Sequence, residues 1–442
     1  MSTIQTINRS RIFMNFIISM LLVFSLLTPQ WTHAATLVVD TLLDENDSSC
    51  SDGDCSLRDA IQLAAAGDII TFSVTGTIVL SLGQLTVEKD LTISGPGQEN
   101  LIVSGNSSSR VFYATGGTVN ISDLTIANGS ADNGGGMYNY DGTSIMENIT
   151  FSGNTANYSG GLFNYGSCML TNVTFSSNSA YNGGGMYNYG TSILTNVIFN
   201  SNSSFNYGGG MISYGTSTLT NVTFSHNSAT EYGGGMFNSG TSTLTNVTFS
   251  DNSAVYSGGM YNYGTSILEN VTFSGNSAVY SGGMYNYYGT ATLTNVTFNG
   301  NSASGFGGGV YVGDDSTLIL KNTILAINTA PKSPDCYGIL ISYGYNLIQN
   351  TTGCTISGDE KGNIYGKDPL LGPLADNGGY TLTYALLPGS PAIDAADFTD
   401  PYGNPVTEDQ RGVSRPQGPV NDIGAFELVY QVHWFWLPFV LK

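Results

Sequence analysis

A repeat of 24 or 25 residues constrains the fold of this chain more than any other feature of its sequence. Each copy carries a Phe that is followed three residues later by Asn, and a Gly-Gly pair that precedes Met, Leu or Val. The Phe positions are 151, 175, 199, 224, 249, 273 and 298. Segments such as "GGMYN", "STLT" and "VTF" alternate apolar and polar residues, which is typical of short β-strands. Such strands can bury a core only when the copies stack, because each strand then pairs with its equivalent in the next copy.

The repeat therefore predicts an all-β fold, a right-handed parallel β-helix built as a solenoid of 24–25-residue coils with a cap at each end. Equivalent residues should stack about 4.8 Å apart. We expect the ring of Phe224 to lie inside the solenoid between Phe199 and Phe249. Asn residues before "VTF", such as Asn246, and after Phe, such as Asn252, should form two side-chain ladders. Asn246-Val-Thr also matches a glycosylation motif, but its regular recurrence favours the ladder.

Several motifs resemble those of known families. "GGM" and "FxxN" resemble the polymorphic outer membrane protein repeat, with Met in place of its Ala-Ile portion. "SCSDGDCSLRDAIQLA" resembles the CSLREA region of exported β-helix proteins, with Asp59 in place of Glu. "DPLLGPLADNGGYTLTYALLPGSPAIDAAD" and "DQRGVSRPQGPVNDIGAFE" resemble the choice-of-anchor Q region, without the further cysteine pair of other members. Together the resemblances imply a secreted or cell-surface β-helix and imply no reaction.

These patterns divide the chain into five parts. Arg9 and Arg11 followed by an apolar run predict a signal peptide cleaved after Ala34. An uncleaved membrane anchor is disfavoured, because Asn15 and Ser19 interrupt the run and it is short for a membrane span. The expected parts are the signal peptide (1–34), a CSLREA-like N-terminal cap (35–66), the β-helix repeats (67–330), a choice-of-anchor Q-like C-terminal cap (331–428) and an apolar tail (429–442). The tail is interpreted either as a buried capping strand or as a sorting signal that anchors the chain to the cell envelope.

Export would permit disulfide bonds. The spacing of the five cysteines favours the pairs Cys50–Cys55 and Cys336–Cys354. Cys168 is left over and occupies a position where other copies carry Ser, so we expect a free thiol without a reactive role.

The charge pattern limits the classes of partner. The formal net charge is −20, and no Lys or Arg lies between Val111 and Leu320. Nucleic-acid binding needs cations that replace phosphate counterions, so this partner class is disfavoured. For the same reason any ligand should be neutral or cationic rather than polyanionic.

Candidate catalytic residues are few. His226 stands at a corner of the repeat where other copies carry Ser, Asp or Gly, which indicates a variable corner residue rather than a general base. Asp314 and Asp315 are interpreted as solvated acids of a turn. We expect no catalytic residue and no cofactor. A polysaccharide lyase or glycoside hydrolase of the β-helix type remains the first alternative.

One acidic loop offers a candidate calcium site. The stretch "DENDSSCSDGDC" brings together Asp44, Asp47, Asp52 and Asp54 beside the first predicted disulfide. Carboxylate oxygens on Gly-containing turns suit Ca²⁺. The spacing does not match an EF-hand, and a solvated acidic loop is the favoured interpretation.

Aromatic residues form the candidate ligand-binding surface. They follow the Met of each Gly-Gly-Met segment, and a second series stands two residues further on, as at Tyr189 and Tyr263. The first series is Tyr138, Phe163, Tyr187, Phe237, Tyr261, Tyr285 and Tyr311. If the Met side chains point inward, strand alternation places both series outside. There they should stack on one another and stabilise the sheet, and they are also hypothesised to expose a stripe for sugar rings or a partner surface.

The sequence thus predicts a non-enzymatic secreted or cell-surface protein with a role in adhesion or in the cell envelope. Its partner would be a glycan or a protein of unknown identity. A structural spacer without a ligand is the second alternative.

Overall fold

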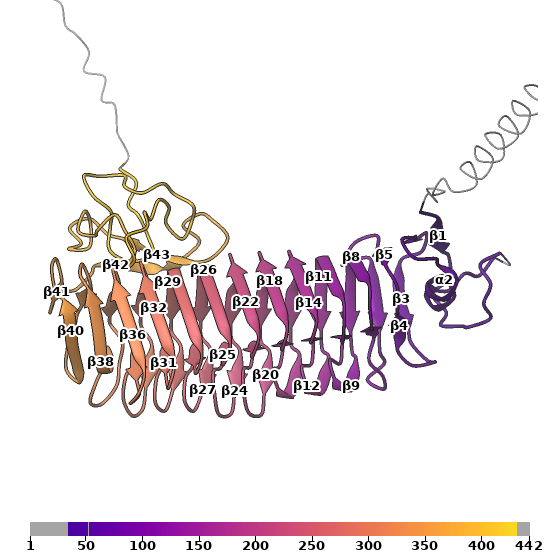
Figure 1. Cartoon of the computed structure of the whole chain (residues 1–442), viewed down its shortest axis with the longest axis horizontal. Coiled ribbons are helices and arrows are strands. Elements are labelled where there is room, and N and C mark those ends of the chain that lie inside the picture. The colour runs from indigo at the N-terminus through magenta and orange to yellow at the C-terminus, as the bar shows by residue number, and fades with distance from the viewer. Residues whose placement is uncertain (1–33, 52, 431–442) are drawn as a thin grey trace, which may run out of the picture. The chain divides into compact units, whose positions relative to one another are not determined.

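Parallel pairing between equivalent strands of successive repeats organises the structure (Figure 1). The computed structural model describes residues 34–51 and 53–430. Phe199 pairs with Phe224, and Phe224 pairs with Phe249 in the same register. The predicted fold class, an all-β parallel β-solenoid of repeated coils, is therefore confirmed. Residues 36–51 and 53–430 belong to one compact unit. The predicted signal peptide and the predicted apolar tail lie almost entirely outside the described residues.

The central coils each contribute strands to three columns. The first column contains the strands that follow the Gly-Gly pairs, together with their equivalents in the first coils: β4 (Leu85–Val87), β7 (Phe112–Ala114), β10 (Met137–Asn139), β13 (Leu162–Asn164), β17 (Met186–Asn188), β21 (Met211–Ser213), β25 (Met236–Asn238), β28 (Met260–Asn262), β31 (Met284–Asn286) and β35 (Val310–Val312). The third column contains short strands: β9 (Ser130–Asn133), β12 (Thr155–Tyr158), β16 (Ser179–Asn182), β20 (Ser203–Ser204), β24 (Ser228–Ala229), β27 (Ser253–Ala254), β30 (Ser277–Ala278) and β34 (Ser302–Ala303).

The second column lies between these two along each coil and carries the "STLT" and "VTF" segments. In some coils the two segments form one long strand, and in others a corner divides them. Its strands are β1 (Thr36–Val39), β2 (Ile69–Phe72), β3 (Gly76–Val79), β5 (Leu91–Ser94), β6 (Leu101–Ser104), β8 (Thr118–Ala127), β11 (Thr143–Ser152), β14 (Ser167–Thr171), β15 (Thr174–Ser176), β18 (Thr191–Thr195), β19 (Ile198–Asn200), β22 (Thr216–Thr220), β23 (Thr223–Ser225), β26 (Thr241–Ser250), β29 (Thr265–Ser274), β32 (Thr290–Thr294), β33 (Thr297–Asn299), β36 (Thr317–Lys321) and β37 (Ile324–Ala326).

A stack of phenylalanine rings forms the centre of the core. The rings from Phe151 to Phe298 lie with centroids 4.5 to 4.8 Å apart and nearly parallel. Phe224 is fully buried between Phe199 and Phe249, as predicted. The Gly-Gly pairs let the backbone approach this stack, because a Cβ on Gly210 would lie 2.9 Å from the Phe224 ring.

Asparagine ladders run along the same coils. The Asn residues after each Phe are buried, and Asn154 Nδ2 donates to Asn178 Oδ1 at 2.9 Å. The Asn residues before "VTF" adopt a left-handed backbone, and Asn246 donates to Asn221 at 3.3 Å. Both predicted ladders are confirmed. A third ladder, which begins with a 2.7 Å bond from Asn139 to Asn164, was not predicted.

Helix α2 (Leu57–Leu63) lies at the N-terminal end of the solenoid (Figure 1), within the segment predicted as a cap. Ser56 caps the helix by accepting a hydrogen bond from the Asp59 amide. The Asp59 carboxylate accepts hydrogen bonds from the Ser48 amide and from the Ser56 hydroxyl. A single acid therefore connects the loop that precedes the helix to its first turn.

Residues 331–428 depart from the predicted arrangement, in which they close the end of the solenoid. The chain first continues the solenoid through β38 (Cys336–Tyr343), β39 (Leu347–Ile348), β40 (Cys354–Asp359) and β41 (Ile364–Tyr365). It then returns along the flank of earlier coils, with a hairpin of β42 (Leu371–Ala375) and β43 (Thr383–Leu386). Figure 1 shows this yellow segment beside β26 and β29. The reason is a set of long-range hydrogen bonds, such as that from the Thr248 hydroxyl to the Leu382 carbonyl at 2.7 Å.

Candidate functional site

Aromatic side chains gather on the outer side of the first strand column. Strand alternation places them there: Met236 and Asn238 are buried inside the solenoid, and Phe237 between them points outward. We call this surface the tyrosine face and divide it into three columns. The floor column is Tyr138, Phe163, Tyr187, Ile212, Phe237, Tyr261, Tyr285 and Tyr311. The outer column, two residues further on, is Tyr140, Tyr165, Tyr189, Tyr214, Ser239, Tyr263 and Tyr287. The flank column, four residues before each Met or Leu, includes Tyr158, Tyr207, Tyr232, Tyr256 and Tyr280.

The floor column is covered, which corrects the prediction that it forms an exposed stripe. Phe163, Tyr187, Phe237, Tyr261 and Tyr285 expose only 4 to 8% of their surface. The reason is that rings of the neighbouring columns pack over them. Tyr207 of the flank column lies 4.8 Å from Phe237, and Tyr214 of the outer column lies 5.5 Å from Tyr187, between ring centroids. The two end members of the column, Tyr138 and Tyr311, are half-buried.

Stacking along the axis, the other predicted role of these rings, is confirmed. In the floor column Phe163 stacks on Tyr187 with centroids 4.8 Å apart, and Phe237 stacks on Tyr261 at 5.5 Å. In the flank column Tyr232 and Tyr256 lie 4.3 Å apart and almost parallel. The columns therefore stabilise the outer side of the sheet as well as shaping its surface.

The outer column supplies the exposed aromatic surface. Tyr140, Tyr165, Tyr189 and Tyr263 each expose about half of their surface (48 to 53%). The rings from Tyr140 to Tyr214 form a continuous stack with centroids 5.6 to 5.9 Å apart. An extended ligand could therefore contact several successive coils through equivalent rings.

A hollow of about 310 Å³ interrupts the outer column. Its lining residues are Tyr207, Tyr214, Tyr232, Phe237, Ser239, Tyr261, Tyr263 and Tyr287. The hollow lies where Ser239 takes the place of the tyrosines that precede and follow it in the column, Tyr214 and Tyr263. A missing ring thus opens a space whose walls are otherwise aromatic.

Sequence reasoning identified part of this site. Phe237 and Tyr261 were predicted as ligand-binding residues, and both line the hollow. The flank column and the effect of Ser239 were missed. The recurrence of Tyr four residues before Met, as in "YGGGM" and "YSGGM", is a signal that could have revealed the flank column.

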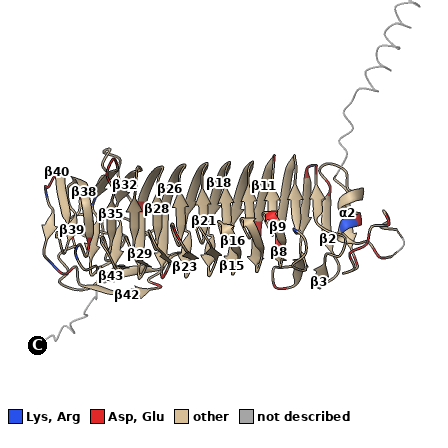
Figure 2. Cartoon of the chain, turned by 90° about the horizontal axis from the view of Figure 1, so that it is seen from below, with Lys and Arg blue, Asp and Glu red and all other residues tan. Residues whose placement is uncertain are grey.

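The tyrosine face is electrically neutral over most of its length. Burial raises the pKa of the Tyr187, Tyr261 and Tyr285 phenols and raises that of Tyr232 to about 12. These hydroxyl groups therefore stay protonated and can both donate and accept hydrogen bonds. Figure 2 shows few charged residues over the central strands, in agreement with the absence of Lys and Arg between Val111 and Leu320. Glu231 adds a carboxylate next to Tyr232.

The acidic loop does not assemble the predicted calcium ligands. Asp44 is paired with Arg58 at 2.8 Å and also accepts hydrogen bonds from the backbone amides of Ser81 and Leu82. Asp47 accepts from the Ser49 amide. The side chain of Asp54 is exposed, and Asp52 lies outside the described residues. In the described part of the chain no three acidic, His or Cys side chains form a group that could hold a metal ion. Asp44 is thus a buried structural ion-pair partner, whereas the sequence favoured a solvated acid and offered a calcium ligand as the alternative.

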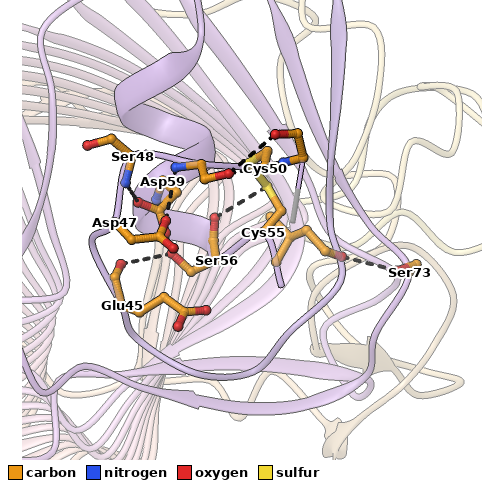
Figure 3. The surroundings of a disulfide bond; sticks show 11 residues. Glu45, Asp47, Ser48, Cys50, Cys55, Ser56, Asp59 and Ser73 are labelled. Atoms are coloured by element: carbon orange, nitrogen blue, oxygen red, sulfur yellow. Dashed lines mark hydrogen bonds between the residues drawn. A yellow bond between two sulfur atoms is a disulfide. The ribbon is translucent and has the colours of Figure 1, made fainter. Parts of the chain in front are cut away.

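Both predicted disulfides are present. Cys50 is bonded to Cys55 beside the loop that Asp59 and Ser56 fix (Figure 3). Cys336 is bonded to Cys354 and joins two successive coils near the end of the solenoid. Cys168 is free, as expected, and its side chain is buried.

The candidate catalytic residues His226, Asp314 and Asp315 do not come together in one site. His226 is an exposed corner residue with φ 56°, and its Nε2 lies 3.9 Å from the carboxylate of Asp251. Asp314 and Asp315 are exposed in the turn between β35 and β36. Neither site lines the aromatic hollow.

Comparisons with known proteins give limited matches. A model of the Chlamydia polymorphic membrane protein repeat matches residues 295–313. Among solved structures, the crystal structure of pectate lyase Pel9A is similar, with a TM-score of 0.44 and 14% sequence identity over 89% of this chain and 97% of that chain. No curated protein matches the chain. In the part of the chain that the structure describes, no helix is long and apolar enough to cross a membrane.

Proposed function

We propose that this protein is an exported, non-enzymatic β-helix that is displayed at the cell surface and binds an extended, uncharged glycan. The stack of Tyr140, Tyr165, Tyr189 and Tyr214 carries this proposal, and the first three of these rings are exposed. Aromatic rings pack against the apolar faces of sugars, and the tyrosine hydroxyl groups can form hydrogen bonds with the sugar hydroxyls. The polymorphic membrane protein repeat and the two disulfides support a location outside the cytoplasm.

The charge distribution supports an uncharged ligand. A polyanion would need Lys or Arg for paired hydrogen bonds, and the chain has neither between Val111 and Leu320. The net charge of −20 would in addition repel a polyanion at a distance.

The test compares binding of the purified chain to immobilised neutral and anionic polysaccharides. Suitable probes are β-1,4-glucan, β-1,4-mannan, β-1,4-xylan and polygalacturonate, without added divalent metal. We expect binding to at least one neutral polymer and none to polygalacturonate. A variant with Tyr140, Tyr165 and Tyr189 replaced by Ser should bind at least tenfold more weakly, which is about 1.4 kcal/mol. The chain itself carries Ser239 in this column, so the fold should tolerate the change.

The matched control replaces two exposed aromatic residues of another face, Tyr181 and Phe205, whose rings also stack at 5.0 Å. This variant should bind like the parent. Equal loss of binding in both variants would contradict the assignment to the tyrosine face. Absence of binding by the parent would favour a structural spacer, and unsaturated or reducing products in the same incubations would favour an enzyme.

A further inference from the structure

We infer that the hollow beside Ser239 is a subsite that holds one uncharged pyranose ring. This inference rests on the proposed function and deepens it, because it separates a single-ring site from the extended stack. The hollow adjoins Tyr214, the last ring of the continuous outer stack. A glycan that follows the stack would therefore reach the hollow at its end.

The size of the hollow suits a single ring. Its volume of about 310 Å³ is at the low end of the roughly 300–1,000 Å³ that ligand pockets occupy. Tyr214 and Tyr263 limit it along the outer column, and Tyr207 and Tyr232 limit it on the flank side. In the adjacent coils tyrosines occupy the position of Ser239, so the missing ring is specific to this coil among the three.

The chemistry of the walls selects the class of ligand. Seven of the eight lining residues are aromatic, and six of these are tyrosines. Rings provide apolar contact with the C–H faces of a sugar, and the phenol and Ser239 hydroxyl groups can bond its hydroxyls. Burial raises the pKa of Tyr261, and that of Tyr232 is raised to about 12, so neither becomes an anion at neutral pH.

The local charge disfavours an acidic sugar. Glu231 lies close enough to Tyr232 to influence its titration, and no Lys or Arg is present within the coils that form the hollow. A uronate ring would bring a second carboxylate beside Glu231 without a cation to pair with it. A neutral hexopyranose avoids this repulsion.

Single-ring probes test the inference directly. The methyl glycosides of β-glucose, β-galactose and β-mannose are added to the full chain, and contact is measured by saturation-transfer NMR. Ser239→Tyr should fill the gap with the residue that the neighbouring coils carry, and it should abolish the signal of the glycoside that binds the parent. Ser239→Ala keeps the space open and should retain a signal. The double variant Tyr165→Ser with Tyr189→Ser should retain it as well, because these residues do not line the hollow.

The outcomes separate the two proposals. If Ser239→Tyr gives the same glycoside signal as the parent, or if the parent gives none, the subsite is wrong, although polymer binding can still stand. If the parent binds none of the neutral polymers and none of the glycosides, both proposals are overturned. The thermal unfolding temperature of Ser239→Tyr is compared with that of the parent. If the two temperatures agree, the loss of binding does not come from unfolding.

Discussion

The side-chain amide of Asn328 donates a hydrogen bond of 2.9 Å to the carboxylate of Asp335, and this contact ends the buried asparagine ladder. The same carboxylate oxygen also accepts a hydrogen bond from the backbone N–H of Asn328, and the other carboxylate oxygen accepts one from the backbone N–H of Asn350. Every earlier member of the ladder is an uncharged amide. Asp335 is therefore the one ionisable group in this hydrogen-bonded column.

The titration of Asp335 should make stability depend on pH. Burial raises its pKa to about 6, despite the hydrogen bonds that favour the charged form. The folded state thus binds a proton more tightly than the unfolded state, and stability should fall as the pH rises from about 4 to about 6. The whole effect should not exceed about 3 kcal/mol. Thermal unfolding midpoints across this range should show a smaller slope for Asp335→Asn than for the parent. Equal slopes would contradict this assignment, since Asp422, whose pKa burial also raises to about 6, is present in both proteins.

Replacement of Phe224 by Ala should destabilise the solenoid by ~3–5 kcal/mol, because it removes buried apolar surface and leaves a cavity between Phe199 and Phe249. The effect should be concentrated in adjacent coils, since each coil contacts only its neighbours. Denaturant unfolding gives the size of the loss, and amide hydrogen exchange gives its location. A loss below about 1 kcal/mol would mean that the surrounding stack closes the cavity.

Gln410 should hold the returning C-terminal segment against the flank. Its side chain is buried and bonds the hydroxyl groups of Thr248 and Thr272 in successive coils and that of Thr381 in its own segment. Gln410→Ala would remove these three bonds and leave the buried Thr272 hydroxyl without its Gln410 acceptor, at a cost of about 1–3 kcal/mol. Limited proteolysis should then cut residues 371–430 faster than in the parent. Gln417→Ala is the matched control, because the Gln417 side chain makes an exposed bond to Ser414. Equal cleavage rates for the two variants would refute the role of Gln410.

Cys168 should react with alkylating reagents only after unfolding. Its side chain is buried in the core, and burial raises the pKa of its thiol. The other four cysteines should be recovered as Cys50–Cys55 and Cys336–Cys354 peptides under non-reducing conditions. Peptide mass mapping with and without denaturant checks both statements. A native peptide that links Cys168 to another cysteine would contradict the observed pairing.

Repetition made much of the fold predictable. Identical residues at a fixed spacing must stack when the copies pair in parallel, so the inward Phe224 and the ladders of Asn246 and Asn252 followed from the sequence. Strand alternation also placed Tyr261 outside the solenoid correctly. The lack of cations in the repeats could also be read from the sequence, because no Lys or Arg lies between Val111 and Leu320.

The sequence by itself therefore determined the solenoid, its inward side chains and the absence of Lys and Arg from its central repeats, since these depend on which residues stand at equivalent places in neighbouring coils. Only the tertiary structure decided that Tyr261 is covered and that Ser239 opens a hollow, because burial outside the sheet depends on how adjacent columns lean over one another. The tertiary structure also decided where residues 371–430 lie. Their hydrogen bonds to the flank, such as that between Thr248 and Leu382, join residues 134 positions apart, and no repeat or local pattern encodes a contact of that range.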